Sequence, residues 1–227
     1  MRIHWTGTAL AIAMGASPLV PGAAVKEQAH TVALPAARRD SGVALEKTLS
    51  ERRSVREFGA AALRLAEIAQ LLWAAQGVTA RGSYRTAPSA GALYPLEVYA
   101  VAARVERLAP GVYRYDPAEH RLLVVSGEDR GAELARAAYG QDWLREAPAI
   151  LVLTGVERRT TRKYGQRGER YVLLEAGHAA QNALLQAIAL GRGATVVGAF
   201  DDKRVRTALG LEAAERPFYL IPVGRPR

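Results

Sequence analysis

Three arginines and a serine stand within five positions at Arg52-Arg53-Ser54-Val55-Arg56. Guanidinium groups donate charge-assisted, partly bidentate hydrogen bonds to phosphate oxygens, and a serine hydroxyl adds one more donor. The pattern therefore predicts a site for a phosphate dianion. Because an arginine run of this kind is more often a solvated surface patch, the prediction depends on what accompanies it along the chain.

A second segment, Ala87-Pro88-Ser89-Ala90-Gly91-Ala92-Leu93-Tyr94-Pro95, consists mainly of small and turn-forming residues. A glycine in such a turn has no side chain that would block a ligand, so the backbone can approach a flat ring closely. The two segments together predict a site for a ring system that carries a phosphate.

The composition narrows the chemistry that this site can use. The chain has 227 residues, of which 49% are hydrophobic, so we expect one globular domain, over residues 43–227. It contains no cysteine, which excludes disulfides, thiolate nucleophiles and cysteine-based metal sites. The four histidines show no paired ligand spacing, so we expect no metal site.

The formal charge of +9 raises nucleic acid as a partner. The basic residues are scattered along the chain, however, whereas a nucleic-acid footprint needs clustered lysines and arginines. We therefore expect no nucleic-acid partner.

The N-terminal segment has the pattern of a targeting signal. A basic residue precedes an apolar stretch and then small residues, which predicts a signal peptide over residues 1–24 and a flexible linker or arm over residues 25–42. No second apolar stretch approaches membrane-spanning length, so we expect no membrane span in the mature chain. The protein is then exported, to the periplasm, or cytoplasmic if the N-terminal segment is not a signal peptide.

The hydrophobic periodicity predicts helices and strands without a strict βα repeat, which indicates an α+β fold with a sheet flanked by helices. The predicted helices are residues 43–50, 63–76, 133–139, 170–190 and 201–209. The predicted strands are residues 96–102, 149–154, 194–197 and 218–223, with a hairpin formed by 111–115 and 121–125.

The longest predicted helix, residues 170–190, carries a stripe of alanines. Such a stripe lets another helix approach closely, as in a subunit interface, and packing against the protein's own sheet explains it equally well. His178 on this helix is more typical of a core histidine than of a catalyst. Gly191-Arg192-Gly193 is interpreted as the end of the helix.

Four segments in this order resemble the nitroreductase-like FMN-dependent superfamily and, within it, the SagB/ThcOx-type dehydrogenase branch. The resemblance covers roughly residues 44–226. It is carried by Arg52-Arg53-Ser54-Val55-Arg56, by Pro88-Ser89-Ala90-Gly91-Ala92-Leu93-Tyr94-Pro95, by Glu175-Ala-Gly-His-Ala-Ala-Gln-Asn182, and by Val197-Gly198-Ala199-Phe200-Asp201 with Pro222-Val-Gly-Arg-Pro226.

The resemblance implies a nitroreductase-like fold, with a central, mostly antiparallel sheet, and an interlocked homodimer that binds FMN at the subunit interface. By position, the cofactor-binding residues near the phosphate and ribityl chain would be Arg52, Arg53, Ser54, Arg56 and Arg225. Ser89, Ala90, Gly91 and Ala92 would face the ring from the partner subunit. Gly198 and Ala199 would lie beside flavin N5, where a peptide N–H orients the reacting edge.

Two positions distinguish the branch. Simple nitroreductases usually have asparagine where Ala92 stands, and the Ala/Gly version is similar to the SagB/ThcOx branch, which oxidises azolines to azoles in peptides. That branch also has a Lys-Tyr pair before the long helix, which Lys163-Tyr164 matches. We expect this pair to be catalytic, with a general base as its hypothetical role. The alternative is a surface lysine beside a packing tyrosine.

The resulting prediction is an FMN-dependent oxidoreductase that transfers hydride through flavin N5 and acts on a small-molecule or peptide-derived substrate. One alternative is an NAD(P)H-dependent enzyme that reduces nitroaromatics or quinones. The other is a non-catalytic exported flavin-binding protein.

Overall fold

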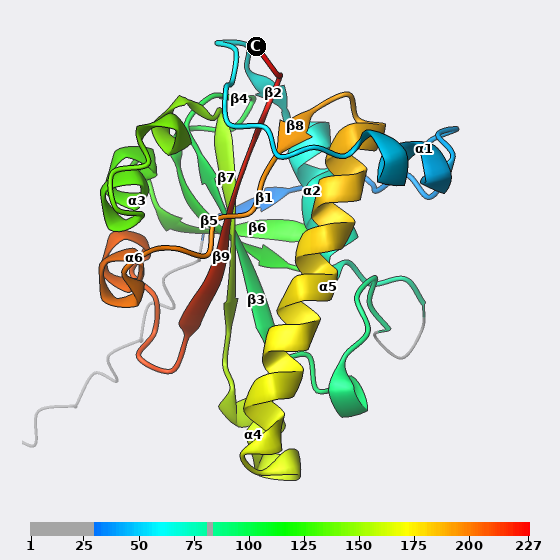
Figure 1. Ribbon diagram of the computed structural model, residues 1–227, viewed down its shortest axis with the longest axis vertical. Helices are drawn as coiled ribbons and strands as arrows, with labels where there is room; N and C mark the ends of the chain where they lie inside the picture. The colour runs from blue at the N-terminus through cyan, green and yellow to red at the C-terminus, as the bar shows by residue number, and fades with distance from the viewer. Residues whose placement is uncertain (1–29, 81–83) are drawn as a thin grey trace, which may run out of the picture.

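The computed structural model describes residues 30–80 and 84–227 (Figure 1). The predicted signal peptide, residues 1–24, lies outside this range. The fold is α+β, as predicted, with a seven-stranded sheet in the order β1-β6-β5-β3-β7-β9-β8, in which every neighbouring pair is antiparallel. A separate two-stranded parallel pair joins β2 and β4.

The strands are β1 (Thr31–Ala33), β2 (Leu63–Arg64), β3 (Leu96–Ala102), β4 (Val105–Glu106), β5 (Gly111–Asp116), β6 (Arg121–Ser126), β7 (Ala149–Gly155), β8 (Gly193–Ala194) and β9 (Arg216–Gly224). The helices are α1 (Leu45–Glu51), α2 (Leu65–Gln76), α3 (Gly131–Ala137), α4 (Arg158–Tyr164), α5 (Arg167–Ala189) and α6 (Asp202–Leu209). Two short 3-10 helices, η1 (Ala90–Ala92) and η2 (Asp142–Glu146), lie between them.

The central strands β3 and β7 are covered on both faces, which explains why their sequences are mainly apolar. On β3, Val98 and Ala100 pack in the core beneath α2 and α5, whereas Tyr99 and Val101 pack with α3, η2 and α6. Figure 1 shows these two helical layers on opposite sides of the sheet. The sheet therefore forms the core of the subunit, and the connecting segments extend from its edges and ends.

The alanine stripe of α5 packs inside its own chain. Ala176, Ala180 and Ala183 are buried in the same core as residues of α2 and the sheet, so the close approach that small residues allow is used within the subunit. The helix ends where Gly191 adopts a positive φ of 67°, as the Gly-Arg-Gly sequence predicts. His178 is exposed on the opposite side, so the expectation of a core histidine was wrong, because its helical position faces away from the sheet.

A buried ion pair joins the start of α2 to the end of α5. Glu67 is 1% exposed and lies 2.7 Å from the Arg192 guanidinium. Its other oxygen accepts a hydrogen bond of 2.7 Å from the backbone N–H of Arg64. Burial alone would raise the pKa of Glu67, but the hydrogen bonds from Arg64 and the charge of Arg192 outweigh it and lower the pKa.

Some elements differ from the sequence prediction. Residues 25–42 contain strand β1, which pairs with β6 at the edge of the sheet and was not predicted. Helix α4 was not predicted either, because its sequence, RRTTRKY, has no apolar stripe. Of the predicted strand 194–197, only the N-terminal end pairs within β8, and Val197 forms an isolated bridge with Leu220. In the described part of the chain, no helix has the length and apolar character that crossing a membrane requires.

Candidate active site

The arginine-rich segment and the C-terminal end of the chain meet at one edge of the sheet. Ser54 forms a bridge with Ala194 of β8, and the N–H of Gly59 donates a 2.9 Å hydrogen bond to the carbonyl of Arg225. The backbone therefore brings residues 52–56 and Arg225 together, although they lie at opposite ends of the domain. These are the residues that the sequence assigned to one phosphate.

The side chains at this edge remain available to an anion. Ser54 and Arg56 are exposed, and Arg52 is half-buried. In residues 30–80 and 84–227, neither Arg52, Arg56 nor Arg225 has an acidic partner at ion-pair distance. Arg53 differs, because its guanidinium donates to the carbonyl of Ser50 at the end of α1. The cations at this edge therefore suit a phosphate ligand.

The predicted ring-facing turn is held in an unusual backbone conformation. Gly91, Ala92 and Tyr94 have φ values of 63°, 53° and 45°, and two of these residues are not glycine. The N–H of Tyr94 closes the turn by donating a 2.9 Å hydrogen bond to Ser89 Oγ. Non-glycine residues at positive φ cost free energy and are concentrated at functional sites, so the surrounding structure must hold this turn in place.

Lys163 and Tyr164, at the C-terminal end of α4, lie against this turn. A Cβ atom added to Gly91 would come within 2.9 Å of Lys163 Nζ and 2.7 Å of Tyr164 Oη. Lys163 Nζ also lies 5.3 Å from the centroid of the Tyr164 ring, and that ring contacts Tyr171 edge to face. The structure thus brings together two predicted site segments that are distant in sequence.

The loop that contains Gly198 and Ala199 is exposed and lies elsewhere on the subunit. It follows the paired residue Val197, and the carbonyl of Ala199 accepts a 3.4 Å hydrogen bond from Gln141. A Cβ at Gly198 would make only an ordinary contact, 3.7 Å, with the Tyr219 ring. Within one subunit, this loop is therefore not brought together with the Ser89–Ala92 turn.

Sequence reasoning missed Glu175, although it opens one of the segments that carry the resemblance. The side chain is buried beneath the turn, and burial raises the pKa of its carboxyl to about 7, although Ser89, Gln76 and Arg85 oppose the rise. The sequence did contain a signal for it, because a glutamate that adjoins the apolar alanine stripe of the helix is expected to be buried. Asn182, at the end of the same segment, donates to the carbonyl of Thr86 and ties α5 to the chain that leads into the turn.

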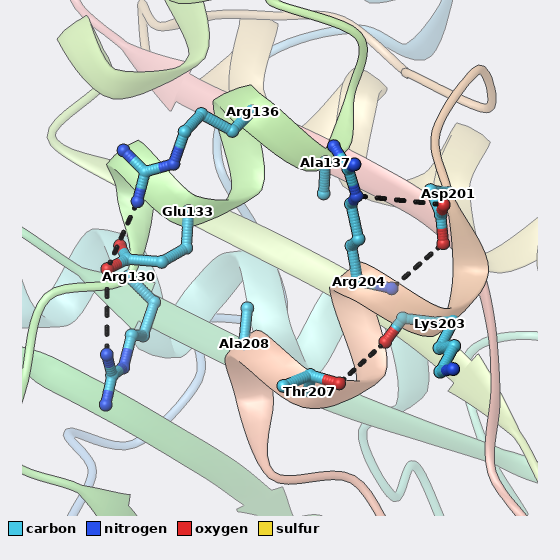
Figure 2. Close-up of a pocket in the computed structure, with 9 residues that line it drawn as sticks. All are labelled: Arg130, Glu133, Arg136, Ala137, Asp201, Lys203, Arg204, Thr207 and Ala208. Carbon is cyan, nitrogen blue, oxygen red and sulfur yellow. Dashed lines mark hydrogen bonds and ion pairs between the residues drawn. The ribbon is translucent and has the colours of Figure 1, made fainter.

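A cavity of about 750 Å³ lies between α3 and α6 and contains none of the predicted site residues (Figure 2). Arg130 and Arg136 pair with Glu133 on one side, and Arg204 pairs with Asp201 on the other. Asp201 also caps α6 by accepting from the Arg204 N–H. The ion pairs and the helix cap therefore explain why these charged residues lie around the cavity, and no ligand is needed to explain them.

The residues present fit a flavin mononucleotide. The edge at Arg52–Arg56 supplies cations and a hydroxyl for the phosphate, and Gly91, which has no side chain, lets Lys163 and Tyr164 lie directly against the turn. The cation-rich edge, the strained glycine turn and the antiparallel sheet between two helical layers define a nitroreductase-like oxidoreductase.

The chain belongs to the Nitroreductase family, whose family model matches residues 49–225. A protein of Methanocaldococcus jannaschii that is provisionally named a nitroreductase is 45% identical over 183 residues, which cover 81% of this chain and 91% of that protein.

Solved structures agree with this assignment. A crystal structure of a protein from Ralstonia eutropha JMP134, also provisionally named a nitroreductase, superposes with a TM-score of 0.76 at 33% identity, covering 93% of this chain and 96% of that one. A chain of the Escherichia coli microcin synthetase McbBCD complex, with truncated pro-MccB17 bound, superposes with a TM-score of 0.70 at 28% identity. That match covers 82% of this chain and 73% of the other.

Proposed function

We propose that this protein is an FMN-dependent oxidoreductase of the SagB/ThcOx type. The observation that carries the proposal is the contact of Lys163 and Tyr164 with Gly91. Both polar atoms lie within 3 Å of one point beside the turn, the position that a Cβ of Gly91 would occupy. The amine of Lys163 and the hydroxyl of Tyr164 therefore lie side by side at the surface of the turn, and a substrate bound against the turn would contact a proton acceptor and a hydroxyl at the same time.

The roles of the residues follow from their positions. Arg52, Ser54, Arg56 and Arg225 hold the phosphate, because exposed cations without acidic partners lose little when they pair with a dianion. With FMN bound, the Ser89–Ala92 turn would face the ring from the partner subunit, and the Gly198–Ala199 backbone would lie beside N5. When bound, FMN supplies the hydride-accepting atom N5. Lys163 receives the proton that the substrate loses, and Tyr164 orients the lysine.

The active unit that we propose is a homodimer in which the turn of one subunit meets the flavin of the other. Several leucines on the surface of the single chain support this: Leu45 and Leu49 on α1 are 59% and 51% exposed, and Leu173 and Leu174 on α5 are 49% and 52% exposed. A second subunit that covered these side chains would remove apolar area from water. It would also bring a second set of site segments close to the first.

For the substrate we propose a peptide-derived azoline that is oxidised to an azole. The similarity to a chain of the microcin synthetase complex supports a peptide substrate, as does Ala92 in a turn where simple nitroreductases usually have asparagine. The alternative is reduction of nitroaromatics or quinones with NAD(P)H, which is favoured by the names of the M. jannaschii and R. eutropha relatives. A non-catalytic flavin-binding protein is the third candidate.

The first test is the visible absorbance spectrum of the purified protein before and after addition of FMN, together with its mass in solution. The proposal expects about one flavin per subunit and a dimer. A colourless protein that does not bind added FMN would overturn both enzyme hypotheses.

A second test separates the substrates by turnover. Azole formation from an azoline peptide supports the SagB/ThcOx type, whereas turnover only with NAD(P)H and a nitroaromatic or quinone supports the alternative. Bound flavin that does not cycle between oxidised and reduced forms with any donor and acceptor would indicate a binding protein.

A further inference from the structure

Glu175 is a buried carboxyl group without an ion pair. The residue is 2% exposed, and its Oε1 atom has no hydrogen-bond partner. In the described part of the chain, no basic side chain lies at ion-pair distance from it. An ionised carboxylate is costly in such a position, so its protonation state depends strongly on what lies around it.

The neighbours of Glu175 connect it to both ends of the ring-facing turn. Arg85 donates a 2.9 Å hydrogen bond to Gln76 Oε1, and Gln76 Nε2, on the other side of the same amide, is buried without a partner. The same arginine lies 4.5 Å above the ring of Tyr94. Ser89, at the other end of the turn, faces the Glu175 carboxyl and accepts the N–H of Tyr94.

A cavity of about 300 Å³ opens beside this network. It lies between the start of the turn and α5 and is lined by Pro88, Ser89, Ala90, Tyr171, Leu174, Glu175 and His178. The carboxyl thus lies at the boundary between the core and the proposed site. A change in its charge therefore acts on the turn directly.

Few charged or titratable groups face this carboxyl. Arg85 is the nearby cation, and it interacts electrostatically with Glu97 on β3 as well as with Glu175. Tyr171 and His178 line the same cavity from α5. Because burial dominates over these groups, the pKa of Glu175 is raised to about 7, and both protonation states are populated near neutral pH.

The two states make different hydrogen bonds. The ionised carboxylate is an acceptor for the Ser89 hydroxyl and the Gln76 amide, the two donors that favour its charged form, and a hydrogen bond from either one would be charge-assisted. The protonated acid has to donate its own O–H, so one of these two donors loses a strong acceptor. The ionised state therefore holds the turn more firmly.

We propose that Glu175 is a proton-linked positioning residue whose ionised carboxylate holds Ser89, and with it Gly91 and Ala92, in the arrangement that binds the flavin ring. This inference rests on the proposed function. It adds that flavin affinity depends on a carboxyl group in the core of the subunit, which does not itself touch the flavin.

The test is a fluorescence titration of the flavin-free protein with FMN at about pH 6 and about pH 8. In the wild type we expect binding about tenfold weaker at the lower pH, because a charge-assisted hydrogen bond is lost. In Glu175→Gln the side chain is uncharged at both pH values, so this variant should bind FMN with the weaker affinity at both. Glu169→Gln, an exposed glutamate on the same helix, is the matched control and should behave as the wild type.

Ser89→Ala provides a second variant if Glu175→Gln folds poorly, because it removes the hydroxyl that links the carboxyl to the turn. It should also lose the pH dependence. If wild type, Glu175→Gln and Ser89→Ala share one pH dependence, the inference is overturned and the proposed function stands. If the wild type binds no FMN at either pH, the proposed function fails and this inference fails with it.

Discussion

Gly91 and Tyr164 lie so close that a single methyl group at Gly91 would reach within 2.7 Å of the tyrosine hydroxyl. Gly91→Ala should therefore displace Tyr164 and Lys163, and we expect FMN affinity or turnover to fall about tenfold or more. The positive φ should also cost about 1 kcal/mol of stability. Both effects are measured by flavin titration and urea denaturation.

Gly140→Ala is the matched control for this substitution. Gly140 has a similar positive φ, 79°, and an added Cβ would meet nothing within 4 Å. It should lose stability to the same extent and keep its flavin affinity. If both variants lose affinity equally, the contact with Tyr164 has no functional role.

Lys163 should matter for turnover and not for flavin binding. Lys163→Ala removes the proposed proton acceptor, so we expect the turnover number to fall about a hundredfold, within the usual range for general base catalysis, with FMN affinity unchanged. Lys203→Ala is the control, because Lys203 is an exposed lysine of the cavity between α3 and α6. Unchanged turnover of Lys163→Ala on a genuine substrate would contradict the role.

Arg56 should contribute to FMN affinity through the phosphate. A hydrogen bond to a charged group contributes about 2 kcal/mol, so Arg56→Ala should weaken FMN binding about thirtyfold. Riboflavin, which lacks the phosphate, should bind both forms alike. Arg136→Ala removes the same charge from the cavity between α3 and α6 and should leave FMN binding unchanged. Equal weakening of riboflavin would show that Arg56 acts elsewhere.

The buried pair of Glu67 and Arg192 should be important for stability. Arg192→Met leaves the carboxylate of Glu67 with only Arg64 as a partner, and we expect a loss of about 2 kcal/mol in the free energy of unfolding. Arg121→Met breaks a more exposed pair with Asp116 and should cost less than about 1 kcal/mol. Urea denaturation at neutral pH compares the two, and similar losses would contradict the prediction.

Glu175 should make the flavin-free protein less stable as the pH rises. Because its folded-state pKa is raised to about 7, its contribution to stability is complete below the ordinary carboxyl value of 4.5 and is lost as the pH rises through 7. At about pH 8, Glu175→Gln should therefore have a free energy of unfolding up to about 3 kcal/mol larger than that of the wild type, and it should melt at a higher temperature. Identical melting curves at that pH would show that the carboxyl does not titrate as we infer.

Much of the fold could be predicted because its signals are local. The run of residues 96–102, rich in valine and tyrosine, became β3 with the predicted bounds, and the helix predicted at 63–76 became α2, beginning two residues later. The hairpin of β5 and β6 followed from the turn residues between two apolar runs. Strand β1 escaped prediction because it is only three residues long, and helix α4 because its sequence has no apolar stripe; their pairing or packing partners stabilise them.

The sequence by itself determined which chemical groups were available: the arginines of residues 52–56, the small residues around Gly91, and the Lys163-Tyr164 pair. Residue type and short spacing determine these, and they require no fold. Only the tertiary structure decided that Lys163 and Tyr164 meet Gly91, that Glu175 is buried without an ion pair, and that His178 faces outward. These relationships depend on how α4 and α5 pack against the sheet and the turn, and such long-range contacts follow from the packing of the whole core.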